Sequence, residues 1–484
     1  MPGKHKTDKH ARHEIIATIA TPLGEGGIGK IVVSGPDALY IVNNMFEGKK
    51  ITDLCNAVSN KLYYGYIHIS GRKIDEVILN VLKKRDSFTG NDLVEINCHG
   101  GIRVVTQIFE YLQAQGVKGT TWESLLSQSF ENDKIDFIQK EALQELVQVR
   151  TKLGTKVLLD QYAGALSGAI KHKLDIIENI RNSLTNKSVN YKTIIDTEPH
   201  EGQKNLSNAS VTPIAPPFEH KDEGDFLNKT FLKLIDHINS LLKNASIGIA
   251  LTSPQTLVIV GKPNVGKSTL INAILGEDRM LVHHEPGTTR DYVCEFISVE
   301  GIPFELVDTA GIRDTEDKLE SISIEMTMEQ IKRADKVIAV FDNSRAFDRE
   351  DDKILIALKS WLQEKSHDCS QQKTETNTII PVINKCDLTA KLDGKKIEME
   401  VKQPLCNISA QKKEGLENLN KRLVKEFDTN YKPAMPVIFN KRQYQLLLKA
   451  RTLLQATLSK NKTDEILHTI DEIKGTFAAC LCGI

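Results

Sequence analysis

The chain has 484 residues, a formal net charge of −1 and a hydrophobic content of 40%. A chain of this length is too long for a single core, so two or three domains are expected. The near-zero net charge excludes a globally basic nucleic-acid-binding protein but leaves room for a local basic patch.

Residues 1–13 are rich in lysine and histidine and lack the apolar stretch of a secretory signal, so they are predicted to form a solvated tail. The sequence contains no apolar run long enough to span a bilayer. The cysteines are scattered, and the close pair Cys480 and Cys482 has no second pair to complete a zinc site. These features predict a cytoplasmic protein that makes no contact with a membrane.

The segment 14–130 predicts a mixed α/β domain. Its apolar runs have the composition of strands, and they cover residues 15–20, 31–34, 77–82 and 93–98. The glycine-rich segment 24–29 resembles a dinucleotide loop only loosely, because no acidic residue follows at a suitable distance. We therefore expect a strained turn there.

The segment 131–251 predicts helices. Apolar residues recur at helical spacing between residues 135 and 184, which indicates amphipathic helices whose apolar stripe faces a core. Within this part, residues 186–223 are polar and contain several prolines, so they predict a loosely ordered insert. A helical pattern returns over 226–251 and again over 429–484.

A phosphate-binding loop, G-x-x-x-x-G-K-S, occupies residues 261–268. The apolar run 257–260 before it predicts a strand and 269–275 after it a helix, which is the context that this motif requires. Lys267 is expected to reach the outer phosphates, and the Ser268 hydroxyl to bind Mg²⁺. The residues of the loop expected to contact the nucleotide are Asn264, Val265, Gly266, Lys267, Ser268 and Thr269.

Two further segments contribute phosphate and metal contacts. A predicted strand at 304–307 ends in the sequence Asp308-Thr309-Ala310-Gly311. A carboxylate at this strand end can hold the Mg²⁺ shell, and the N–H of the glycine can bind a terminal phosphate. Upstream, Thr288 and Thr289 belong to a G-T-T-R-D sequence, and the second threonine offers a hydroxyl to the same metal.

The base is selected by a motif at the end of the predicted strand 379–383, where Asn384, Lys385 and Asp387 form N-K-x-D. A carboxylate here accepts two hydrogen bonds from the N–H edge of guanine, and adenine offers no such pair of donors. Ser409 and Ala410 would bring backbone N–H groups to the guanine carbonyl. Together these motifs predict a GTP-binding domain over residues 252–428.

Longer strings carry a more specific resemblance. They are residues 17–22, 26–29, 34–38, 86–92, 94–101 and 287–291, together with Pro263 and Asn264 in the phosphate-binding loop. Through them the chain resembles, over nearly its whole length, the tRNA-modification GTPase family called MnmE or TrmE.

The resemblance implies a fold of class α/β plus α. An N-terminal mixed α/β, folate-binding-like domain (14–130) would mediate a homodimer. A discontinuous helical domain (131–251 and 429–484) would carry an inserted Ras-like P-loop GTPase domain. It also implies a function: with an FAD protein of the MnmG type, in a hetero-oligomer, the family modifies the wobble uridine of certain tRNAs. The product is a carboxymethylaminomethyl group, and a formyl-tetrahydrofolate supplies the one-carbon unit.

The resemblance further implies how GTP is hydrolysed. Ile312 stands where Ras-like proteins place a water-orienting glutamine, and an apolar side chain cannot orient water. The family instead holds a K⁺ ion, here with the Asn264 side chain and carbonyl oxygens at His283, Glu285 and Thr288. Glu320 corresponds to the family's catalytic glutamate. Its alternative reading is a solvated acid at a helix start.

Some positions depart from the family. Val32 occupies the place of an arginine that contacts folate, whereas Glu95 and Lys134 match folate-contacting positions. The family's C-terminal cysteine corresponds to Cys482, but Ile484 replaces the final lysine. Two alternatives therefore stay open: a GTPase switch with impaired folate chemistry, and a ribosome-associated GTPase of the Era or Der kind. The N-terminal strings disfavour the second, and no RNA-binding module follows the GTP-binding domain.

Overall fold

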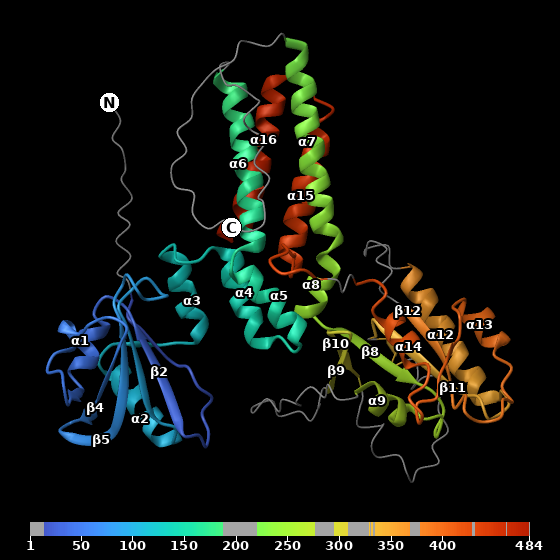
Figure 1. The fold of residues 1–484 in the computed structure, drawn as a ribbon, viewed down its shortest axis with the longest axis horizontal. Helices are drawn as coiled ribbons and strands as arrows, with labels where there is room; N and C mark the ends of the chain where they lie inside the picture. The colour runs from blue at the N-terminus through green and yellow to red at the C-terminus, as the bar shows by residue number, and fades with distance from the viewer. Residues whose placement is uncertain are drawn as a thin grey trace. The chain divides into compact units, whose positions relative to one another are not determined.

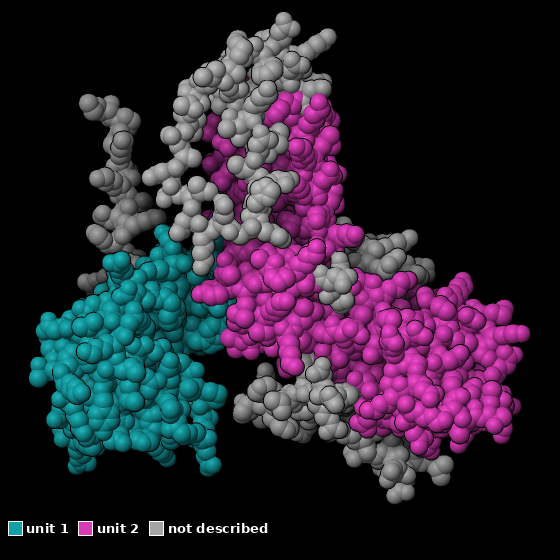
Figure 2. Space-filling view, in the orientation of Figure 1, with its two compact units in different colours: residues 1–144 teal, residues 145–484 magenta. Residues whose placement is uncertain are grey.

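The computed structural model describes residues 14–186, 220–275, 295–307, 329, 331–332, 334–367, 378–427, 431–460 and 462–483. The chain forms two compact units, Met1–Gln144 and Glu145–Ile484 (Figure 1; Figure 2). Together they contain a mixed α/β N-terminal fold, a second α/β fold that carries the phosphate-binding loop, and a group of long helices.

The first unit is built on a seven-stranded sheet with the strand order β3-β4-β5-β6-β2-β1-β7. All neighbouring strands are antiparallel except the pair β1 and β7. The strands are β1 (Ile16–Ile19), β2 (Ile28–Ser34), β3 (Phe46–Gly48), β4 (Lys61–Ile69), β5 (Arg72–Leu82), β6 (Leu93–His99) and β7 (Lys118–Gly119). The predicted runs correspond to β1, β2, β5 and β6, whereas β3, β4 and β7 were not predicted.

Alternation along these strands separates two faces of the sheet. One face carries Ile31 and Val33, which belong to a core with Val105 and Ile108 of helix α2 (Ile102–Ala114). The other helical elements of this unit are α1 (Ala38–Asn43), the 3₁₀ turn η1 (Leu54–Asn56), α3 (Trp122–Glu131) and the start of α4 (Phe137–Gln148). The opposite face of the sheet includes the large exposed side chains of Leu62, Tyr64 and Ile78.

The glycine-rich segment 24–29 is not the strained turn that the sequence suggested. None of its glycines has a positive φ. Gly29 lies in β2, and a Cβ atom there would stand 2.3 Å from Cγ2 of Val105 in α2. Glycine is therefore required at this position because the helix packs closely against the strand.

The second unit contains a six-stranded sheet with the order β13-β12-β11-β8-β10-β9. It is parallel apart from the antiparallel pair β9 and β10. The strands are β8 (Gln255–Val260), β9 (Glu295–Val299), β10 (Ile302–Leu306), β11 (Lys336–Asp342), β12 (Thr378–Asn384) and β13 (Cys406–Asn407). The runs predicted at 257–260, 304–307 and 379–383 correspond to β8, β10 and β12, but the central strand β11 was not predicted.

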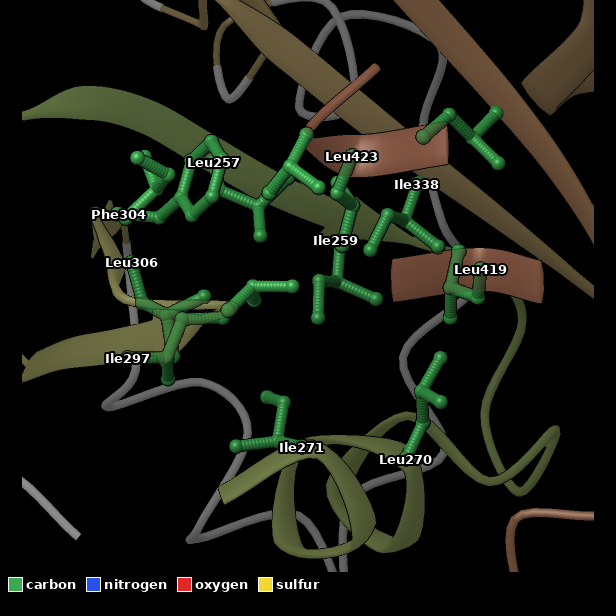
Figure 3. Close-up of a cluster of buried hydrophobic side chains, with 14 of the residues drawn as sticks. Leu257, Ile259, Leu270, Ile271, Ile297, Phe304, Leu306, Ile338, Leu419 and Leu423 are labelled. Carbon is green, nitrogen blue, oxygen red and sulfur yellow. The ribbon is translucent and has the colours of Figure 1, made fainter. Parts of the chain in front are cut away.

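Helices cover both faces of this sheet. On one face, Leu270 of α9 (Lys267–Leu275) and Leu419 of α14 (Leu416–Leu423) join a core with Ile259 of β8 (Figure 3). On the other face, α12 (Arg349–His367) and α13 (Lys395–Val401) pack on the sheet, and Trp361 of α12 is fully buried there. In such a sheet the ligand binds at the carboxyl ends of the parallel strands.

Long helices form the rest of the second unit. Helices that precede the six-stranded sheet in the sequence contact helices that follow it. Helix α15 contacts α7, α16 contacts α6, and α15 and α16 contact each other (Figure 1). Their bounds are α5 (Lys152–Tyr162), α6 (Ala165–Asn186), α7 (His220–Lys243), α8 (Ala245–Thr252), α15 (Lys441–Thr457) and α16 (Thr463–Cys482). Within the described ranges, no helix has both the length and the apolar character needed to cross a membrane.

Candidate nucleotide-binding site

The phosphate-binding loop joins β8 to α9, as the motif requires. Gly266 has φ +96°, and a Cβ atom there would stand 2.4 Å from Nδ2 of Asn384. At Gly261 a Cβ atom would stand 2.6 Å from the carbonyl oxygen of Val340 in β11. Gly266 is therefore needed for its backbone conformation, and both glycines are needed because neighbouring strands pack closely against them.

Lys267 lies at the start of α9 with its side chain folded over the loop. Its Nζ donates to the carbonyl oxygens of Gly261 and Lys262, each at 2.9 Å. Burial lowers the pKa of this ammonium group. Ser268 and Thr269 are exposed in the first turn of the helix, where partial positive charge favours a bound phosphate.

The base-selecting motif contacts the phosphate-binding loop directly. Asn384 donates from Nδ2 to the carbonyl of Val265 at 2.8 Å and accepts a hydrogen bond from the N–H of Ala410 at 2.9 Å. Lys385 donates from Nζ to the carbonyl of Asn264 at 2.7 Å. The structure thus brings together three segments that the sequence assigned to one nucleotide site.

Asp387 occupies the end of the same motif. A hydrogen bond from the Ser409 side chain is the main cause that holds the pKa of Asp387 below its usual value, so the carboxylate is ionised at neutral pH. The N–H of Cys386 donates to the carbonyl of Ile408 at 3.1 Å, which fixes the two loops side by side. A fixed carboxylate can accept the paired N–H groups of guanine.

Asp342, at the carboxyl end of β11, is a site residue that the sequence analysis missed. It is buried and accepts hydrogen bonds from Lys385 Nζ and Ser344 Oγ, both at 2.7 Å. Burial alone would raise the pKa of Asp342, but these hydrogen bonds outweigh it and lower the pKa. The signal in the sequence was an acidic residue directly after the apolar run 337–341.

Lys262, inside the phosphate-binding loop, was also missed. Its Nζ lies 2.8 Å from Oδ2 of Asp348 and 2.7 Å from Oδ2 of Asp351. The D-x-x-D spacing before a helical run is typical of a helix N-terminus, but it does not indicate a pairing with Lys262.

Several residues that the sequence singled out for the nucleotide site and its chemistry lie outside the described residues. They are His283, Glu285, Thr288, Thr289, Asp308, Thr309, Ala310, Gly311, Ile312 and Glu320. Of the predicted cation ligands, Asn264 and Ser268 are described, and both are exposed. In the described part of the chain, no group of three or more His, Cys, Asp and Glu side chains is placed to hold a metal ion.

The predicted folate residues lie in the first unit, each with its own partners. Glu95 pairs with Lys30 at 3.0 Å and accepts from Asn80 at 3.1 Å. Lys134 donates to the carbonyl of Arg85 at 3.0 Å. It lines a polar cavity of about 390 Å³ together with Lys84, Arg85, Gly90, Glu131, Asn132 and Asp133.

Val32 is directly opposite Glu95 in the β2–β6 register, so both side chains lie on the same face of the sheet. It is 4% exposed and belongs to an apolar cluster with Ile16, Leu93 and Leu125. The valine offers neither a charge nor a donor to a ligand on this face.

Cys482 is exposed at the end of α16, whereas Cys480 is buried. The guanidinium of Arg442 donates to the carbonyls of Ala479 at 3.0 Å and Cys480 at 3.2 Å. These bonds fix the last turn of the helix and with it the backbone that carries Cys482.

In comparison with known proteins, each of the two α/β folds matches a family model. A family model described as "GTP-binding protein TrmE N-terminus" matches residues 15–134, and one described as "50S ribosome-binding GTPase" matches residues 256–385. The chain is 32% identical to the tRNA modification GTPase MnmE of Bacillus velezensis, over 93% of this chain and 91% of that protein. It is 36% identical to the protein of the same name from Carboxydothermus hydrogenoformans, over 85% and 81% of the two chains.

We predict that Asp387→Asn exchanges guanine preference for xanthine preference. The amide replaces an acceptor by a donor, so GTP should bind about tenfold or more weaker while XTP gains affinity. Fluorescence titration with both nucleotides measures this. The assignment is wrong if the variant binds GTP as tightly as the parent and does not bind XTP.

Proposed function

The chain belongs to the MnmE family of tRNA modification GTPases, and we propose that it hydrolyses GTP in order to modify the wobble uridine of certain tRNAs. The family is the one that the sequence motifs predict. The observation that carries the GTPase assignment is the contact of Asn384 and Lys385 with the carbonyls of Val265 and Asn264. This contact supports one nucleotide site formed by the N-K-x-D motif and the phosphate-binding loop.

The residues of this chain suit GTP and Mg²⁺. The loop N–H groups and the start of α9 would bind the phosphates, and Lys267 would exchange its two carbonyl partners for phosphate oxygens. Ser268 and Thr289 would hold Mg²⁺, with Asp308 in its shell. Asp387 would select the base, with the backbone N–H groups of Ser409 and Ala410 close to its carbonyl.

We extend the proposal to K⁺-dependent hydrolysis. The Asn264 side chain and the carbonyl oxygens of His283, Glu285 and Thr288 would hold K⁺. A bound K⁺ would supply the positive charge that an arginine finger supplies elsewhere. Because Ile312 cannot orient water, Glu320 would do so. The exposure of Asn264 at the rim of the loop supports its share of this role.

The partners follow from the same family. We propose a homodimer formed through the N-terminal domain 14–130, an FAD partner of the MnmG type, and tRNA as substrate. The exposed apolar side chains of Leu62 and Ile78 on one sheet face support a protein contact there. The contacts of α15 and α16 with α6 and α7 support a discontinuous helical domain (131–251 and 429–484) that carries an inserted GTPase domain (252–428).

A second candidate is a GTPase switch with impaired folate chemistry. The burial of Val32 in an apolar cluster favours it, because no donor reaches the ligand from this position. In this candidate Glu95 and Lys134 would still contact a formyl-tetrahydrofolate. Under the first proposal, Cys482 would take part in the modification chemistry.

We predict that deletion of the gene removes the carboxymethylaminomethyl group from wobble uridines. Nucleoside analysis of purified tRNA by mass spectrometry measures the loss. The parent protein should restore the modification, and Lys267→Ala should not, because the lysine that reaches the phosphates is missing. Unchanged wobble uridines in the deletion strain would refute the proposed function.

We predict that GTP hydrolysis is fast in KCl and slow in NaCl at matched ionic strength. Asn264→Ala should abolish the stimulation by K⁺ and keep most of the nucleotide affinity. In the same assay Glu320→Ala should bind GTP normally and hydrolyse it ~10²–10⁴-fold more slowly. Equal rates of the parent in both salts, at saturating GTP, would exclude the K⁺ site.

We predict that folate binding is weakened by the absence of a charged side chain at position 32. Val32→Arg should tighten the binding of formyl-tetrahydrofolate about tenfold or more, because a charge-assisted contact is gained. Calorimetric titration measures this, with Val32→Leu as the matched control. If the parent already binds in the low micromolar range, or if the arginine changes nothing, this position is neutral.

A further inference from the structure

Lys262 is a buried lysine at the second position of the phosphate-binding loop. Its side chain is 9% exposed, and its ammonium group lies within hydrogen-bond distance of Asp348 and Asp351. Asp351 is itself 3% exposed, so one of the two ion pairs is almost completely removed from water. The side chain points into the protein and ties the loop to the start of α12.

The two carboxylates are held in place by α12 itself. Oδ2 of Asp351 accepts from the N–H of Asp348 at 3.1 Å, and Oδ1 of Asp348 accepts in return from the N–H of Asp351 at 3.3 Å. This reciprocal pattern is that of a helix N-terminal capping box. Lys262 therefore binds an acceptor pair whose position the helix has already fixed.

Burial alone would lower the pKa of Lys262, but the hydrogen bonds and charges of Asp348 and Asp351 outweigh it and raise the pKa. The hydrogen bond from Lys262 lowers the pKa of Asp348, whereas burial raises the pKa of Asp351 against the opposing effect of the same lysine. A buried charge whose partner is removed is costly, whereas the intact pair contributes geometry more than net stability. The pair is therefore suited to fix the position of a backbone.

The backbone that it fixes belongs to the catalytic machinery. The carbonyl oxygens of Gly261 and Lys262 accept both hydrogen bonds of Lys267. Two further points of the loop are held from β12, by Asn384 at Val265 and by Lys385 at Asn264. Lys262 holds the first turn of the loop, which these two contacts do not reach.

We propose that Lys262 is a positioning residue for GTP binding and hydrolysis. It touches no nucleotide; it holds the first turn of the loop against α12 and so sets the place from which Lys267 reaches the phosphates. The inference rests on the proposed GTPase function, since Lys267 is otherwise an ordinary, partly buried lysine. A displaced loop would weaken both nucleotide affinity and rate.

The alternative is that Lys262 only stabilises the fold. Lys336 provides a matched control, because its side chain is 2% exposed and pairs with Glu426 at 3.2 Å. It lies at the first residue of β11, whereas Asp342 and the nucleotide loops lie at the other end of that strand. Removing either lysine removes a buried ion pair from the same domain, but only Lys262 belongs to the phosphate-binding loop.

The experiment compares Lys262→Met with Lys336→Met in the full-length protein. Methionine keeps the apolar stem and removes the charge. The measurements are the Kd for a fluorescent GDP analogue, kcat and KM for GTP, and Tm. We expect both variants to lower Tm, and only Lys262→Met to weaken GDP binding and lower kcat/KM, by ~10–100-fold. Lys262→Arg should recover most of the activity, because a guanidinium can donate to both carboxylates.

Unchanged Kd and kcat/KM in Lys262→Met, or equal losses in both methionine variants, would overturn the inference. If Lys262→Met does not fold, Asp351→Asn tests the same contact with nearly unchanged volume, and normal GDP binding by that variant would overturn the inference. A parent protein that binds GDP but does not hydrolyse GTP would refute the proposed function instead, and the Kd values would still test the role of Lys262.

Discussion

The nucleotide site depends on one buried amide. Asn384, at the end of β12, is 2% exposed and bridges two loops through Val265 and Ala410. The bridge is possible because β8, β11 and β12 are parallel neighbours, so their carboxyl ends meet at one edge of the sheet. An unpaired amide buried at this depth would be costly, and the two loops are thereby held in one relative position. The same amide requires a glycine at position 266, since any side chain there would collide with it.

Around this amide, two lysines of the site are held by ion pairs. Lys385 joins Asp342 to the carbonyl of Asn264, and Lys262 joins the loop to α12. Buried ion pairs contribute little net stability, because desolvation offsets most of the attraction. They do reject alternative loop positions, since any such position would leave a charge unpaired. For a loop that wraps phosphates, a fixed backbone position is therefore more important than added stability.

Only some of these contacts could be predicted from the sequence. The phosphate-binding loop and N-K-x-D are local patterns, and their strands β8 and β12 were recognised from the same short segments. The equally apolar strand β11 was missed because no known motif follows it, and with it the role of Asp342. The partners of Lys262 are 86 and 89 residues away along the chain, and no local pattern encodes such a pairing. Likewise, the need for Gly29 comes from α2, which packs on β2 from a distant part of the chain.

The N-terminal sheet shows why one substituted position does not establish that a function is lost. Side chains two residues apart on a strand point to the same face. Lys30 therefore shares a face of β2 with Val32, and its ammonium group lies 3.0 Å from Glu95, the residue directly opposite Val32. The carboxylate is thus matched by a cation although position 32 is apolar. From the sequence alone, valine at position 32 removes a positive charge from this face. The face nevertheless keeps a charged pair, because Lys30, two residues earlier on the same strand, supplies the cation that faces Glu95.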